Sequence, residues 1–353
     1  MKRWIALSLV LLLVVSLWGC KKEEKASDPA PNTAPTQPAP TDPTDPLVQY
    51  PDFYLLTKIS GTLLNEIDYV DVDIQLFYDS AYQLLRTDHF MGSALNTSVN
   101  YRSNTLELLS KQIYGDDGQV MESYVHDYDD AGNLLSITGV NNAGEVIYSQ
   151  IHGYTADGYP DYYETYYSGV LGYWESYHYD ENGYRDSYSS GDGQGNLYID
   201  LRYRNVVEDG KLKAIIALQD GEYYHTIAYN DDGNPVTEVY YEPKYKVIKT
   251  IQYTYTESGK PLLESHTDGD GKEYYRVEYA YDGLDQLSQI RIFHDGQLEQ
   301  NEEFTYHEGR LLSRKCYTYG QLDAEYTYTY ELVLIPEQQA AILSDLYAEL
   351  MNN

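Results

Sequence analysis

Histidines are the first residues of this sequence that could bind a metal ion. His126 and His152 occupy equivalent positions in a sequence repeat of about 25 residues. Equivalent strands of a two-strand repeat lie ~9.6 Å apart, so the two rings would have to lean together to share an ion. We therefore expect these histidines to pack as aromatic rings, and we predict no metal site.

The acidic stretch Asp268-Gly269-Asp270-Gly271-Lys272 begins like a calcium-binding loop. Such a loop needs an oxygen ligand where Lys272 stands and a glutamate that closes it further on. The stretch has neither, and aspartate and glycine are also the residues that tight turns require. The sequence therefore predicts a turn here.

The motifs of common enzyme classes are absent. No glycine-rich phosphate loop follows a strand, and neither a Gly-x-Ser-x-Gly elbow nor a His-Glu-x-x-His helix occurs. The 56 acidic residues leave a carboxylate pair for glycoside hydrolysis open as an alternative. We predict a protein that is not an enzyme, with no catalytic residue and no cofactor.

The N-terminus reads as a targeting segment. Lys2 and Arg3 precede an apolar run from Trp4 to Trp18, which is short for a membrane span and has the length of a secretory core. The following Leu17-Trp18-Gly19-Cys20 resembles the bacterial lipobox, although Trp18 is unusual there. The resemblance implies a lipoprotein signal peptide over residues 1–19 and a lipid on Cys20. An ordinary signal peptide or an N-terminal anchor helix is the alternative.

Cys316 is the second of the two cysteines. With Cys20 acylated, Cys316 has no partner for an internal disulfide. It lies at an alternating strand position between Lys315 and Tyr317. We expect a small packing residue and not a nucleophile.

Residues 20–51 form a region of different composition. Eight of the 13 prolines of the chain occur in it, at Pro29, Pro31, Pro35, Pro38, Pro40, Pro43, Pro46 and Pro51. The segment lacks the apolar residues needed to fold, so we predict a disordered, semi-extended linker that follows the lipidated cysteine.

A tyrosine followed by a turn recurs along residues 52–331. These anchor tyrosines are Tyr78, Tyr101, Tyr128, Tyr154, Tyr179, Tyr203, Tyr229, Tyr255, Tyr281, Tyr306 and Tyr330. In the best copies an Asp or Asn after the tyrosine can bond its own backbone, and a Gly three residues later can take a positive φ. Nearly every unit holds a second turn, as at Asp220-Gly221 and Asp295-Gly296. Two turns per repeat predict two strands per repeat and a continuous antiparallel meander of about twenty strands.

The pattern Tyr-Asp-x-x-Gly-Asn-Leu, clearest at Tyr128–Leu134 and Tyr229–Asn234, resembles the YD (tyrosine-aspartate) repeats of bacterial Rhs-type proteins. The likeness covers about Leu76 to Tyr330, but the arginine and the fuller consensus of that family are mostly missing. The resemblance implies a long strand ribbon that spirals into a shell. Members of the family often enclose a toxin. We expect this chain to be a short, lipid-anchored relative without an appended toxin domain and without the toxin role.

The repeat predicts a sheet with two different faces. Positions two before an anchor are mostly apolar or aromatic, and positions one before are mostly small or polar. The first set includes the candidate ligand-facing aromatics Tyr177, Tyr253, Tyr279, Phe304 and Tyr328. Exposed, aligned rings would favour a ligand surface, whereas rings buried by curling would favour a scaffold.

The predicted fold is all-β. Strand twist of roughly 20° per step adds up to about a full turn over such a meander, which predicts a curled or spiral sheet. Pro336 then begins a segment with helical apolar spacing, so we predict an amphipathic helix over 336–351 that caps the open edge or the end of the sheet. A partner-binding role for this helix is the alternative.

Composition limits the partners. The 42 tyrosines give rings that are apolar yet tipped by a hydroxyl, and the formal charge of −32 disfavours nucleic acid. We predict a non-enzymatic lipoprotein held to the cell membrane or outer membrane by the lipid on Cys20 and exposed outside the cytoplasm. Its sheet would be a scaffold or binding surface for protein or glycan. A cell-wall carbohydrate hydrolase and an envelope assembly component are the alternatives.

Overall fold

The computed structural model describes residues 53–65, 68–102 and 105–333, and within these ranges every regular element is a β-strand. The first eleven strands are β1 (Phe53–Asn65), β2 (Asp68–Tyr78), β3 (Leu84–Met91), β4 (Ala94–Tyr101), β5 (Leu108–Tyr114), β6 (Val120–Tyr128), β7 (Leu134–Asn141), β8 (Val146–Tyr154), β9 (Pro160–Tyr167), β10 (Val170–Tyr179) and β11 (Arg185–Gly191). The other eleven are β12 (Leu197–Glu208), β13 (Lys211–Gln219), β14 (Glu222–Tyr229), β15 (Pro235–Glu242), β16 (Lys246–Tyr255), β17 (Pro261–Asp268), β18 (Glu273–Tyr281), β19 (Leu287–His294), β20 (Gln297–His307), β21 (Arg310–Thr318) and β22 (Gln321–Val333).

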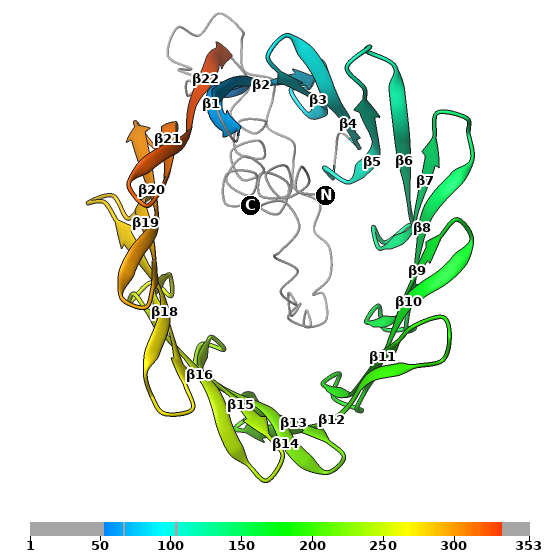
Figure 1. Cartoon of the computed structure of the whole chain (residues 1–353), viewed down its shortest axis with the longest axis vertical. Helices are drawn as coiled ribbons and strands as arrows, with labels where there is room; N and C mark the ends of the chain where they lie inside the picture. Colours follow the sequence, from blue (N-terminus) through cyan, green and yellow to red (C-terminus); the bar gives the residue numbers. More distant parts are fainter. Residues whose placement is uncertain (1–52, 66–67, 103–104, 334–353) are drawn as a thin grey trace, which may run out of the picture. The chain divides into compact units, whose positions relative to one another are not determined.

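The 22 strands form one antiparallel meander, as the two turns per repeat predict. The chain divides into a unit over Leu56–Tyr330, which carries the sheet, and a second unit made of both chain ends. Each strand pairs with the next, as in β14–β15, β15–β16 and β16–β17. Figure 1 shows the strands following one another around a ring.

The first and last strands close the ring, because β1 also pairs with β22. At this seam the Thr57 hydroxyl donates to the Thr329 carbonyl at 3.4 Å, and the Tyr69 hydroxyl donates to the Leu322 carbonyl. A Cβ on Gly61 would lie 2.0 Å from the Glu325 carbonyl oxygen, so only glycine permits this approach of the two backbones. The sheet is therefore a closed barrel, which confirms the predicted antiparallel meander and its curl but shows a closed ring where a spiral was the other form predicted.

The expected capping helix over 336–351 lies outside the described residues, as do Cys20, the signal segment 1–19 and the linker 20–51. In the described part of the chain no helix is long and apolar enough to span a membrane.

The turns have the chemistry that the sequence predicts. In the turn after Tyr128, the Asp129 carboxylate accepts the backbone N–H groups of Ala131 and Asn133 at 2.9 and 2.8 Å, and Gly132 has a φ of 87°. Shorter hairpins use two residues that both have positive φ, as at Asp220 and Gly221, with φ of 51° and 83°. That is the type I′ geometry that matches strand twist.

A β-bulge precedes most of the anchor tyrosines, which the sequence did not reveal. The pairing register shifts between Asp127 and Tyr128, between Thr254 and Tyr255, and at the same place in several other repeats. A bulge bends its strand and increases the local twist. Recurring bulges thus supply curvature that a closed sheet needs.

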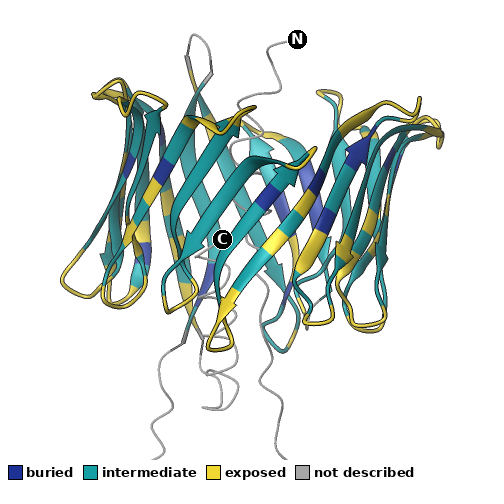
Figure 2. Ribbon diagram, turned by 90° about the horizontal axis from the view of Figure 1, so that it is seen from below, coloured by how far each residue is buried: buried dark blue, intermediate teal, exposed yellow. Residues whose placement is uncertain are grey.

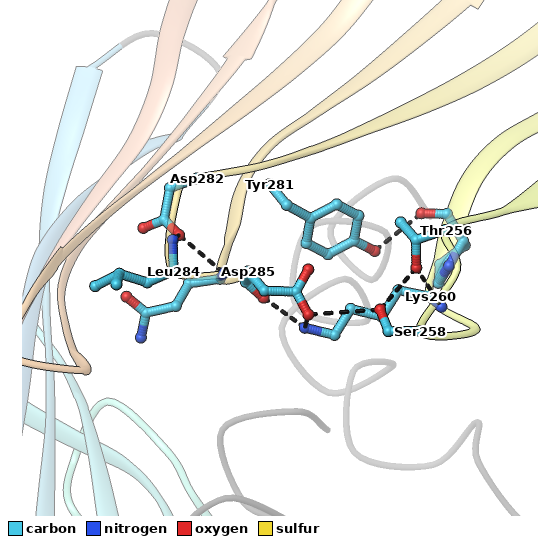
Figure 3. Close-up of polar contacts among 9 residues, drawn as sticks. Thr256, Ser258, Lys260, Tyr281, Asp282, Leu284 and Asp285 are labelled. Carbon is cyan, nitrogen blue, oxygen red and sulfur yellow. Dashed lines mark hydrogen bonds and ion pairs between the residues drawn. The ribbon is translucent and has the colours of Figure 1, made fainter.

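The anchor tyrosines tie consecutive turns together along one rim of the barrel. The Tyr255 hydroxyl donates to the Pro235 carbonyl at 2.7 Å, and the Tyr281 hydroxyl donates to the Pro261 carbonyl at 2.9 Å. Figure 3 shows the second of these contacts beside a bridge in which the Lys260 ammonium group reaches the Asp285 carboxylate at 2.7 Å. Each of these two anchors thus holds the end of its own strand to the start of the strand before it.

The two faces of the sheet differ as predicted. We call the face that carries the anchors the tyrosine face. The large or small apolar residues that are fully buried lie mainly on it, namely Val99, Leu201, Ala217, Ile251, Val277 and Ala324. Several residues one before an anchor, among them Asp127, Thr254 and Thr329, are exposed. Most other strand residues are half-buried, because this sheet has a single layer, and exposure is greatest at the turns of both rims (Figure 2).

Candidate functional site: the tyrosine face

The structure spreads the five predicted aromatic residues around the tyrosine face. Tyr253, Tyr279, Phe304 and Tyr328 lie on the alternate strands β16, β18, β20 and β22, whereas Tyr177 lies apart on β10. All five are half-buried. They do not form one cluster. Their rings are neither fully exposed, which would favour a ligand surface, nor fully buried, which would favour a scaffold.

Tyr253 belongs to a hydrogen-bonded group centred on Glu238. Its hydroxyl donates to Glu238 Oε1 at 2.9 Å, while Glu238 Oε2 lies 3.1 Å from both the Tyr240 hydroxyl and His225 Nε2. The hydrogen bond from His225 holds the pKa of Glu238 below its usual value, with help from the two tyrosines and against the effect of burial. Burial and the Glu238 carboxylate raise the pKa of Tyr253 well above its usual value. The group is therefore a carboxylate held by one imidazole and two tyrosine hydroxyl groups.

The next strands extend this group into a belt of histidines, carboxylates and tyrosines. On β17, His266 Nε2 lies 2.5 Å from Glu264 Oε1. The His266 ring meets the ring of Tyr275 edge-on at 4.8 Å, and Tyr275 in turn contacts His294 at 5.0 Å. Burial raises the pKa of Tyr279 to about 12.

Sequence reasoning missed the carboxylates of this belt. Glu238 and Glu264 stand 26 residues apart, each nine residues after an anchor tyrosine. The repeat spacing was thus a usable signal. This signal was hidden because the turns and bulges shift the alternation between the two faces by one residue. Counting every second residue from an anchor tyrosine therefore gives the wrong face on the following strand.

Tyr177 has a separate group of partners. Its hydroxyl donates to Glu175, which also accepts the Tyr173 hydroxyl at 2.7 Å. The Tyr188 ring lies 5.4 Å from the Tyr177 ring, and the Arg185 guanidinium lies 4.6 Å from the Tyr177 ring centroid. These contacts hold the ring and restrict its orientation.

Phe304 and Tyr328 flank an arginine–glutamate pair. Arg314 Nε and Nη2 contact Glu302 at 3.1 and 2.9 Å, and the Arg314 guanidinium lies 5.9 Å from the Phe304 ring centroid. Burial raises the pKa of Tyr328 to about 12. Burial also raises the pKa of Cys316, two residues from Arg314 on β21, to about 11. A thiol that stays protonated agrees with a packing role for Cys316.

The candidate metal ligands have other contacts. The His152 ring packs on the Tyr163 ring at 5.1 Å. The Asp268 carboxylate accepts the backbone N–H groups of Asp270 and Lys272 at 3.0 and 2.9 Å, which is turn geometry. Within the described ranges no three His, Cys, Asp or Glu side chains are grouped so as to hold a metal ion.

Comparison with known proteins shows distant likeness in structure. No protein-family model matches the chain, and no curated protein is similar to it in sequence. A chain of the TcdB2-TccC3 crystal structure without the hypervariable C-terminal region is 12% identical with a TM-score of 0.32, over 81% of this chain and 20% of that one. A porin-like protein from Bacteroides uniformis is 12% identical with a TM-score of 0.28, over 80% of this chain and 100% of that one. The match to the Photorhabdus luminescens Tc holotoxin pore has 12% identity and a TM-score of 0.27, over 72% of this chain and 19% of that one.

This chain thus spans about a fifth of the length of the toxin chains it matches. The TM-scores are too low for any of these likenesses to bear on function. The YD-repeat resemblance stays a prediction.

Proposed function

We propose that this protein is a non-enzymatic lipoprotein, anchored through Cys20 on the outer side of a cell membrane or outer membrane, whose closed sheet is a binding scaffold for protein or glycan. One observation carries the proposal. Tyr253 and Tyr177 are held in place by hydrogen bonds to Glu238 and Glu175 while their rings stay half-buried.

A scaffold role is supported by the closure of the sheet. Among the described strands no edge is open to another chain, so the protein avoids the usual route of sheet aggregation. The anchor hydroxyls bind neighbouring turns at intervals of one repeat. Both features favour a fixed frame.

A binding role is supported by the chemistry of the frame. Tyrosine rings bind sugars and peptides with little loss of conformational entropy, and rings that are already oriented lose less still. The acidic balance of the chain makes nucleic acid an unsuitable ligand.

The test is a binding screen with glycans, cell-wall fragments and envelope proteins. Tyr253→Ala, Phe304→Ala and Tyr328→Ala are combined in one variant, and Thr254→Ala, Thr305→Ala and Thr329→Ala in its control. Each control residue is the exposed neighbour of a tested ring and lies on the opposite face. We expect the first variant alone to lose binding. Equal binding by both variants, with the fold intact by circular dichroism, would contradict the proposal.

The anchor has a separate test. Cys20→Ser should move the protein from the membrane fraction to the soluble fraction, because a lipid chain is what holds it there. A Cys20→Ser protein that stays in the membrane fraction would show that the lipid is not the anchor.

A further inference from the structure

A hollow of about 670 Å³ lies on the anchor rim between two neighbouring turns, Asp129–Asn133 and Thr155–Tyr159. We call it the rim hollow. The Tyr154 hydroxyl, which donates to the Leu134 carbonyl at 3.0 Å, ties the two turns together. The volume is in the range of sites that hold small ligands.

The lining of the rim hollow combines flat rings with uncharged and acidic polar groups. Tyr154 and Tyr162 provide the rings, and Asp129, Asn133 and Asp157 provide carboxylate and amide groups. The His152 ring lies on the other face of the sheet, against Tyr163. Among the described residues, no lysine or arginine lines the hollow. A phosphate, sulfate or other anion would therefore find no positive charge there.

Part of this lining is fixed before any ligand arrives. Asp129 Oδ2 accepts the Asn133 side-chain amide at 2.8 Å, which orients that amide. The Tyr162 ring covers Gly153 so closely that a Cβ on that glycine would lie 2.0 Å from Tyr162 Cε1. Even so, Tyr162 is 41% exposed, so part of its ring stays available.

One polar group of the lining has no partner within the described residues. Asp157 is exposed, and its carboxylate makes no hydrogen bond or ion pair there. A carboxylate without a partner can accept hydrogen bonds from a ligand.

We infer that the rim hollow binds a neutral or amino sugar at the end of a glycan, with the sugar face against Tyr162 and its hydroxyl groups donating to Asp157. Sugars are the ligand class that presents an apolar face to a ring and several hydroxyls to a carboxylate and an amide. The inference names a ligand class for the proposed scaffold, but its site is separate from Tyr177, Tyr253, Tyr279, Phe304 and Tyr328. Either proposal can therefore fail alone.

The test titrates the full-length protein with N,N′-diacetylchitobiose, cellobiose, maltose and glucosamine by calorimetry. We expect at least one of them to bind. A hydrogen bond to a charged group contributes enough that Asp157→Ala should weaken binding about tenfold or more. Tyr162→Ala should also weaken binding, whereas Tyr162→Phe should retain it because the ring is kept.

The matched control is Asp232→Ala. Asp232 occupies the same place in the turn after Tyr229 that Asp157 occupies in the turn after Tyr154, and it is equally exposed but does not line the hollow. It should leave affinity unchanged. Neither Asp157 nor Asp232 is buried, so neither change threatens folding.

Two results would overturn the inference. The first is that none of the four sugars binds. The second is that Asp157→Ala binds the sugar as tightly as Asp232→Ala does. If the combined Tyr253, Phe304 and Tyr328 variant then fails to bind the sugar, the tyrosine face holds it instead. Loss of binding in Asp157→Ala alone would support the rim hollow and count against the tyrosine face as the sugar site.

Discussion

The hydroxyl groups of the anchor tyrosines should stabilise the barrel measurably. Six of them donate to a backbone carbonyl 19 to 22 residues earlier in the chain, those of Tyr78, Tyr128, Tyr154, Tyr255, Tyr281 and Tyr330. Tyr255→Phe removes only the oxygen that donates to the Pro235 carbonyl at 2.7 Å. The ring, and hence the buried apolar area, is preserved.

The expected loss follows from the hydrogen bond alone. A net intramolecular hydrogen bond contributes about 1 kcal/mol, and water can reach a carbonyl at the rim, so Tyr255→Phe should cost about 1 kcal/mol or slightly less. Tyr128, Tyr255 and Tyr330 lie on the well-separated strands β6, β16 and β22. Their effects should add, so the triple Phe variant should lose about 3 kcal/mol.

Urea denaturation followed by circular dichroism measures this loss as a shift of the midpoint at constant slope. Tyr319→Phe is the control, because Tyr319 is 71% exposed and its hydroxyl has no hydrogen bond within the described residues. If Tyr255→Phe and Tyr319→Phe shift the midpoint equally, the anchor hydroxyls do not hold the rim together. A triple variant no less stable than the single one would refute the additive argument.

Three further changes test other parts of the structure. Gly139→Ala places a Cβ 2.6 Å from Tyr124 Cε1, so it should destabilise the barrel by about 1–3 kcal/mol. The same urea assay measures this loss, and an unchanged midpoint would mean that the Tyr124 ring moves freely. The pKa of Glu238 is lowered on folding, so its contribution to stability is present above the unfolded value of 4.5 and is lost as the pH falls through the lower folded value. The melting temperature of Glu238→Gln should therefore fall less than that of the parent on acidification below pH 4.5, and parallel curves would refute this assignment. Cys316, with its pKa raised to about 11, should react with iodoacetamide much more slowly in the folded protein than in urea, and equal rates at pH 8 would contradict its burial.

The sequence by itself determined the local features of this protein. The turns could be predicted because Asp129 and Gly132 act through their own backbone, within five residues. The strands could be predicted because the alternation of apolar and polar residues, as at Ile251, Tyr253 and Tyr255, reports the period of a strand directly. The placement of the five candidate aromatics on the tyrosine face follows from the same alternation.

The tertiary structure alone decided how the strands close and which side chains meet. The seam uses β1, which precedes the recognisable repeat, and depends on Gly61 approaching Glu325 across more than 260 residues. Bulges that shift the register between strands position the belt around Glu238 and the rim hollow. Periodicity fixes the face on which a side chain lies, but its partners are set by long-range register, which a repeat of nearly identical strands does not encode locally.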